Sequence, residues 1–146
     1  MKMQLAPEKV GFRISTTDLE AVYTESSGVK LRLDAQRIDD VKSEVYRGIE
    51  ITFLVVAELR CITLNFFDNH YDSFEIKGGI DNEMAFWEEN GYHPNPNFYQ
   101  VVNSYILENK RKLFDPNERL DLKHYLVIGN DSYLDIISST YQVRYL

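Results

Sequence analysis

The sequence contains a single cysteine, Cys61, and this scarcity excludes several kinds of protein. One thiol cannot form an internal disulfide or a zinc site built from several thiolates, and it fits a reducing compartment. No run reaches the roughly eighteen apolar residues of a membrane span, and the N-terminal segment lacks the apolar stretch of a signal peptide. We therefore expect a cytoplasmic protein that does not associate with a membrane.

The common motifs of enzyme active sites are absent as well. The patterns GxxxxGK(S/T), GxGxxG, GxSxG and HExxH do not occur, so phosphate-cradling, dinucleotide-binding, serine-hydrolase and zincin assignments have no support. A net charge of −7 argues against nucleic acid as a partner, because binding to the phosphate backbone depends on Lys and Arg. We predict no cofactor and no bound metal, and we single out no catalytic residue.

The length of 146 residues matches one domain over residues 1–146, without a linker, repeat or low-complexity tract. Alternating apolar residues predict a strand over 10–14, after a frayed leader, and a half-exposed strand over 29–33. Between them, residues 17–23 carry a capping-box pattern that favours a short helix, with a strand as the alternative.

The stretch 45–67 is strongly β-prone, but its apolar residues change parity near 57–60. Because a shift of one residue turns every side chain to the opposite face, we expect a tight reversal or a bulge around Ala57 and Glu58. The first part of this stretch is apolar on both faces, which predicts a central strand. A short strand over 74–76 then continues an antiparallel meander.

Two main helices are expected in the second half. Residues 81–90 read as a helix with Asp81 as N-cap and Gly91 in the left-handed position after its end. Apolar spacing favours a second helix over 98–112; the alternative is a strand over 98–102 followed by a helix capped by Ser104. A final hairpin turns at residues 129–131.

Together these elements predict an α+β fold. We expect a single domain with an antiparallel, meander-rich sheet of six to eight strands, packed against the two main helices at about 81–90 and 98–112. The helices would cover one face of the sheet.

The negative charge is concentrated in residues 68–97. This window holds seven carboxylates against one cation, Lys77, and so carries −6 of the net −7. Glu88 and Glu89 stand near the predicted helix C-terminus, where they oppose the partial negative charge of the helix dipole. Residues that break a local rule in this way are enriched at functional sites. The candidate binding residues are Asp68, His70, Asp72, Asp81, Trp87, Glu88, Glu89, Tyr92 and His93.

Our leading hypothesis is a non-catalytic domain that uses this acidic, aromatic surface to engage a basic protein partner. An inhibitor, antitoxin or immunity-type protein is one concrete version, because clustered carboxylates steer association with cationic surfaces. The ordinary alternative is that these carboxylates serve solubility or pair with Arg and Lys elsewhere in the fold. Asp68, His70 and Asp72 also have a spacing that a metal could use, although a solvated turn explains them better.

The alternative function is small-molecule binding or hydrolysis in a sheet-lined pocket, with His70, His93 or His124 as the polar group. A pocket of several hundred cubic ångströms with convergent polar groups would favour it. His124 shares parity with neighbouring apolar residues, which favours a hydrogen-bonded histidine at the core edge. A homodimer through the Tyr-rich C-terminal strands is a third hypothesis, resting on Tyr125, Tyr133, Tyr141 and Tyr145.

Overall fold

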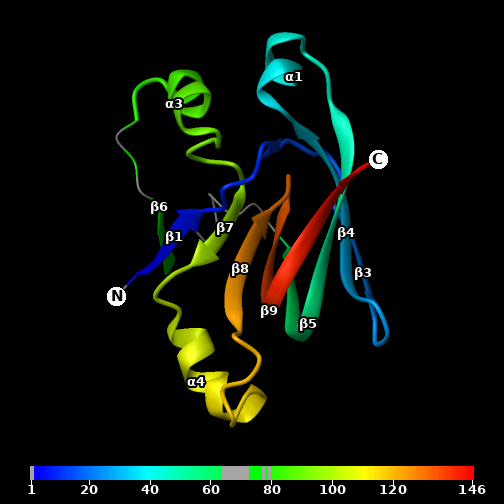
Figure 1. Cartoon of the computed structure of the whole chain (residues 1–146), viewed down its shortest axis with the longest axis vertical. Helices are drawn as coiled ribbons and strands as arrows, with labels where there is room; N and C mark the ends of the chain where they lie inside the picture. Colours follow the sequence, from blue (N-terminus) through cyan, green and yellow to red (C-terminus); the bar gives the residue numbers. More distant parts are fainter. Residues whose placement is uncertain (1, 64–72, 77, 79) are drawn as a thin grey trace.

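The computed structural model describes residues 2–63, 73–76, 78 and 80–146, and these residues form one curled, mixed sheet with short helices at its ends (Figure 1). The strands are β1 (Met3–Pro7), β2 (Arg13–Ile14), β3 (Glu20–Thr24), β4 (Gly28–Gln36), β5 (Arg47–Thr63), β6 (Phe74–Ile76), β7 (Phe98–Val101), β8 (Lys123–Ile128) and β9 (Ser132–Tyr145). The helices are α1 (Ile38–Lys42), α3 (Glu83–Asn90) and α4 (Tyr105–Phe114).

The strand order is β2-β4-β5-β9-β8-β7-β1-β6, and β3 also pairs with β4. Among the described strands, β1 and β6 pair in parallel and all other neighbours are antiparallel. The expected meander does not continue from β5 into β6, although β7, β8 and β9 again pair in chain order. The second neighbour of β5 is β9, because a long partner satisfies far more of its backbone groups than the three residues of β6.

The parity change in β5 is a bulge, and the strand does not reverse there. The register with β9 shifts between Val56 and Glu58, so one extra residue is accommodated while the strand continues to Thr63. Val55, just before the shift, has a φ of 55°, a left-handed conformation that is unusual for a β-branched residue. The strand is central, as predicted, with β4 and β9 on its two sides.

The predicted helix over 98–112 is wrong in its first part. Residues 98–101 form β7, in which Phe98 and Tyr99 pack into clusters on opposite faces of the sheet. The helix starts only after Ser104, whose side chain accepts the Leu107 N–H, and this is the alternative that the sequence left open. Apolar residues at helical spacing misled the prediction, because a strand buried on both faces is also apolar throughout.

Other boundaries also differ from expectation. Asn82, and not Asp81, caps α3, whereas Gly91 ends it with a φ of 81° as predicted. Residues 20–24 form a strand, which was the second reading of that segment. The predicted strand over 10–14 is reduced to β2. The expected frayed leader contains β1, because Met3 and Leu5 alternate into a buried cluster between β6 and β7.

Two apolar clusters lie on the two faces of the sheet. The main cluster fills the inside of the curl with residues from β2, β4, β5, β7, β8 and β9. β8 is buried on both faces, since Tyr125 and Val127 join this cluster while Leu126 and Ile128 join the other. Along the described chain, none of the helices has the length and apolar character needed to cross a membrane.

The helices do not cover a sheet face as expected. α1 and α3 lie together at one end of the curled sheet, and α4 lies at the other (Figure 1). Leu107 of α4 closes its end by packing with Leu122 and Ile137. The other end of the sheet, beside α1 and α3, carries the loop 91–97 that follows α3 (Figure 1).

Candidate functional site

The residues predicted for the acidic, aromatic surface separate into two groups. Trp87 and His93 are buried, each with 3% exposed surface, and Tyr92 is half-buried. The carboxylates that are exposed are Asp81, Glu88 and Glu89. The remaining three predicted residues, Asp68, His70 and Asp72, lie outside the described residues. Of the described members, the aromatic ones therefore point inward and the acidic ones outward.

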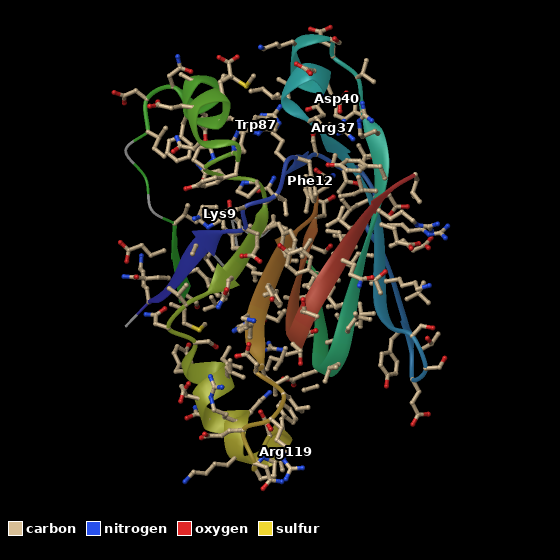
Figure 2. The ribbon with its side chains drawn as sticks, viewed as in Figure 1. Lys9, Phe12, Arg37, Asp40, Trp87 and Arg119 are labelled. Carbon is tan, nitrogen blue, oxygen red and sulfur yellow. The ribbon has the colours of Figure 1, made fainter. Side chains whose placement is uncertain are left out.

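Trp87 anchors α3 to the loop that follows it. Its ring meets the His93 imidazole edge-on with 5.1 Å between centroids, while Phe86 meets Tyr92 in the same way at 5.3 Å. The Lys9 ammonium lies 5.7 Å from the centre of the Tyr92 ring. Figure 2 places Trp87 at the α3 end of the domain. The left-handed Gly91 makes this return of the chain feasible.

The loop after Gly91 is held rigidly against β2. Pro94 and Pro96 exclude helix, and the Ile14 N–H donates to the Pro96 carbonyl at 2.9 Å. Asn97 has a φ of 59°, which asparagine tolerates better than most residues, and its side chain donates to the Ile14 carbonyl at 3.1 Å. These bonds set the position of Asn95, which lies between the two prolines.

Asn95 connects His93 to α3. Its backbone N–H donates to His93 Nδ1 at 2.8 Å, and its side-chain Nδ2 donates to Glu83 Oε2 at 2.8 Å. Burial lowers the pKa of His93; the Glu83 carboxylate opposes this effect and the Arg13 guanidinium adds to it. The imidazole is therefore neutral at pH 7, and because Nδ1 is an acceptor, Nε2 carries the proton.

These residues line a cavity of about 600 Å³ beside α3. It lies between β2, the end of β6, the loop 94–97 and the first turn of α3, and its lining is mixed polar and apolar. The polar lining residues are Arg13, Ser15, Glu83, His93, Asn95, Asn97 and Tyr99. The volume is within the range of small-molecule sites in proteins.

Two buried atoms in the cavity lining have no hydrogen-bond partner in the described part of the chain, Arg13 Nε and Asn95 Oδ1. A carboxylate only accepts hydrogen bonds, so the bond to Glu83 fixes the amide of Asn95 with its nitrogen toward Glu83. The unsatisfied atom is thus an acceptor, whereas Arg13 Nε is a donor. Buried polar atoms are normally satisfied, so both call for an explanation.

Arg13 and Glu83 are charged lining residues without an ion-pair partner. Within the described residues, neither side chain lies within 4.0 Å of a group of opposite charge. Arg13 and Glu83 therefore do not pair with each other either. To the part of the chain that the structure describes, the Arg13 guanidinium makes one hydrogen bond, from Nη2 to Gln36 Oε1 at 3.2 Å. The cavity therefore holds one separated cation and one separated anion.

Outside the cavity, α3 presents the exposed carboxylates. Glu88 accepts from Lys42 of α1 at 2.8 Å, and both side chains are 55% exposed. The pKa of Lys42 is raised by this hydrogen bond and by the Glu88 charge. Asp81 and Glu89 have no cationic partner among the described residues.

His124 is buried and hydrogen-bonded, as its parity predicted. Ser104 Oγ lies 2.7 Å from Nδ1, and Asp135 Oδ1 lies 2.7 Å from Nε2. Sequence reasoning missed these two partners, which are 20 and 11 residues away. The residue types are those of a hydrolytic triad, but the ring is reversed, with the serine on Nδ1 and the carboxylate on Nε2. Ser104 Oγ also accepts the Leu107 N–H, and all three residues are buried, so we assign them a structural role.

The C-terminal tyrosines pack mainly within their own chain. Tyr125 and Tyr141 join Phe53 and Phe98 in a cluster of four rings inside the curl. Tyr133 is buried in the second cluster, and Tyr145 is 38% exposed, with the Arg37 guanidinium 4.2 Å from its ring centre.

The fold and cavity define a curled-sheet domain with a polar, partly buried pocket at one end. Among the described residues, no group of three or more His, Cys, Asp or Glu side chains is arranged to hold a metal ion. Comparisons with protein-family models, with curated proteins and with solved structures find no match to this chain. Arg13, Glu83 and Asn95 carried no recognisable motif, and only the two prolines around Asn95 pointed to a rigid loop.

Proposed function

We propose that the protein binds a small polar molecule in the cavity beside α3. This is the alternative function considered from the sequence, with His93 as one of its polar groups. The observation that carries it is the pair of buried, unsatisfied atoms, Arg13 Nε and Asn95 Oδ1, in the lining of a cavity of about 600 Å³. A ligand with an acceptor for the first and a donor for the second would satisfy both.

The state of His93 supports binding more than catalysis. Its Nδ1 is occupied by the Asn95 N–H, and the neutral ring carries its proton on Nε2. A general base needs an unprotonated nitrogen within reach of the proton that it removes. His93 instead offers a donor that orients a ligand, and the edge-on contact with Trp87 holds the ring in place.

The test is ligand-observed NMR with a defined mixture of four chemical classes: free amino acids, monosaccharides, nucleosides and small carboxylic acids. We expect saturation transfer to at least one compound. The variant Ser15→Phe fills the cavity and is expected to abolish the signal, whereas Ser26→Phe, at an exposed turn, is expected to retain it. Circular dichroism confirms that both variants fold. No binding by any class, or equal binding by Ser15→Phe, would overturn the proposal.

A second candidate is the predicted contact between the acidic surface and a basic protein, of the inhibitor or immunity type. It is favoured by the exposure of Asp81 and Glu89 and by the exposed Lys42–Glu88 pair. Such a pair contributes only about 0–1 kcal/mol, so a cationic partner can replace Lys42 easily.

The charge-reversal variant Glu88→Lys/Glu89→Lys tests this second candidate. A pull-down from native lysate at low salt is expected to lose its partner with this variant and to keep it with Glu20→Lys/Glu25→Lys on the β3–β4 hairpin. An unchanged set of captured proteins would exclude the acidic surface as the contact.

A further inference from the structure

We propose that the ligand of the cavity is a zwitterion, specifically a free α-amino acid with an uncharged side chain. This inference rests on the proposed small-molecule function and deepens it. It starts from the two charged lining residues, Arg13 and Glu83, which stand apart from each other and from all other charges in the described part of the chain.

The charge of Arg13 is the first step. Its guanidinium is a cation with five N–H donors and no acceptor, and the side chain is partly buried. Gln36 accepts one hydrogen bond but supplies no negative charge. Buried charges are usually paired, and the Nε end of this charged group is buried. A ligand carboxylate beside Nε would supply both the missing charge and the missing acceptor.

Glu83 provides the complementary half. Its carboxylate accepts one hydrogen bond from Asn95 Nδ2, and a carboxylate can accept several more. Asn95 Oδ1, the unsatisfied acceptor, belongs to the same amide, so two acceptors are joined through one side chain. An ammonium group has three donors and a positive charge, which suits this pair of acceptors.

The overall charge balance of the cavity separates a zwitterion from a simple ion. Among the described lining residues the charged groups are Arg13 and Glu83, while His93 is neutral at pH 7 because burial lowers its pKa. The charges of Arg13 and Glu83 then cancel. A phosphate or dicarboxylate would leave Glu83 opposing it, and a polyamine would leave Arg13 opposing it, whereas a zwitterion meets each charge with its opposite.

Space for the ligand side chain lies next to the charged end. A smaller cavity of about 270 Å³ shares Ile14, Ser15 and Asn97 with the first, and it continues toward the β8–β9 turn. Its other lining residues are Thr16, Ile128, Gly129 and Asn130. None of these residues carries a charge, which is why the expected side chain is uncharged and small or medium in size.

The experiment is isothermal titration calorimetry of the unmodified protein with each of the uncharged L-amino acids. The strongest binder is then compared with two matched analogues, the amine that lacks its carboxylate and the hydroxy acid that lacks its ammonium. Each analogue is expected to bind about 10- to 100-fold more weakly, because it leaves one charged hydrogen-bonding group unpaired. Equal binding of either analogue would overturn the zwitterion assignment.

Variants assign each half of the ligand to one residue. Arg13→Gln is expected to weaken binding of the amino acid and leave binding of the amine unchanged, whereas Glu83→Gln is expected to spare the hydroxy acid. The controls are Arg119→Gln, at the opposite end of the molecule (Figure 2), and Glu25→Gln at the exposed β3–β4 turn. A loss that is the same for all three ligands would contradict the pairing.

The outcome also separates this inference from the proposed function. If a monosaccharide, a nucleoside or a carboxylic acid binds in a manner that Ser15→Phe abolishes, while no amino acid competes, the amino acid assignment fails and the binding function stands. If no compound of any class binds, both fail. The analogue series uses the unmodified chain, so the conclusion does not depend on the folding of a variant.

Discussion

Replacing Ser104 with alanine is expected to destabilise the protein more than the loss of an ordinary helix cap. Ser104 Oγ accepts the Leu107 N–H at 3.0 Å and lies 2.7 Å from His124 Nδ1. Loss of a serine cap costs about 1 kcal/mol. Loss of the hydroxyl also leaves a buried ring nitrogen without a partner, which costs about 1–3 kcal/mol more. The free energy of unfolding should therefore fall by about 2–4 kcal/mol.

A matched cap deletion separates the two contributions. Asn82 caps α3 by accepting the Ala85 N–H at 3.0 Å at an exposed site, so Asn82→Ala is expected to cost only about 1 kcal/mol. Urea denaturation followed by circular dichroism gives both free energies, provided that the two variants keep the same m-value. Equal losses would refute the reasoning, because they would mean that His124 gains nothing measurable from Ser104.

Three further outcomes are expected. The hydrogen bond from the Arg47 side chain, and to a smaller extent the one from the Arg37 backbone N–H, lowers the pKa of Asp40 from 3.8 to about 2. The stability that Asp40 contributes is therefore complete above pH 3.8 and is lost as the pH falls toward 2. Asp40→Asn should flatten acid denaturation curves in this window. Burial raises the pKa of Glu8 above 4.5. Its contribution to folding stability is therefore present below pH 4.5 and is lost as the pH rises through the raised pKa. Glu8→Gln should become more stable relative to wild type as the pH rises, and a pH-independent difference in unfolding free energy would contradict this. Because Trp87 is the sole tryptophan and contacts His93, ligand binding should change its fluorescence emission, and unchanged emission at saturation would place the ligand elsewhere.

Local features of the fold were predictable where the backbone geometry at a position strongly favours one type of residue. Gly91 ends α3, Ser104 caps α4 in the alternative considered, and the parity change near Ala57 is a bulge. Each depends on backbone geometry or side-chain direction within a few residues. The half-exposed strand over 29–33 was equally clear, because one face is buried and the other is wet.

Strand neighbours were not predictable in the same way. Nothing within 45–67 indicates that β5 pairs with β9, since the pairing depends on matching two long strands far apart in the chain. Met3 and Leu5 look like a leader until β6 and β7 are known to flank them. Hydrophobic alternation identifies a strand and leaves its partner open.

The candidate site shows the same division. His93 was singled out as a polar group for a pocket, and it lines the cavity. Arg13 and Glu83 were not, because they are 70 residues apart and become neighbours of His93 only through the curl of the sheet and the bonds of Asn95. An unsatisfied donor or acceptor is a property of the folded chain, and no spacing in a sequence reveals it.

The pairing of β5 with β9 also bears on how the protein is made. Ile49 lies opposite Tyr145, 96 residues later in the chain, and β1 is flanked by strands that begin at Phe74 and Phe98. β1 and β5 therefore keep an open edge until strands much later in the chain have been synthesised. Contacts of such long range make folding slow and leave unpaired strand edges exposed while it proceeds.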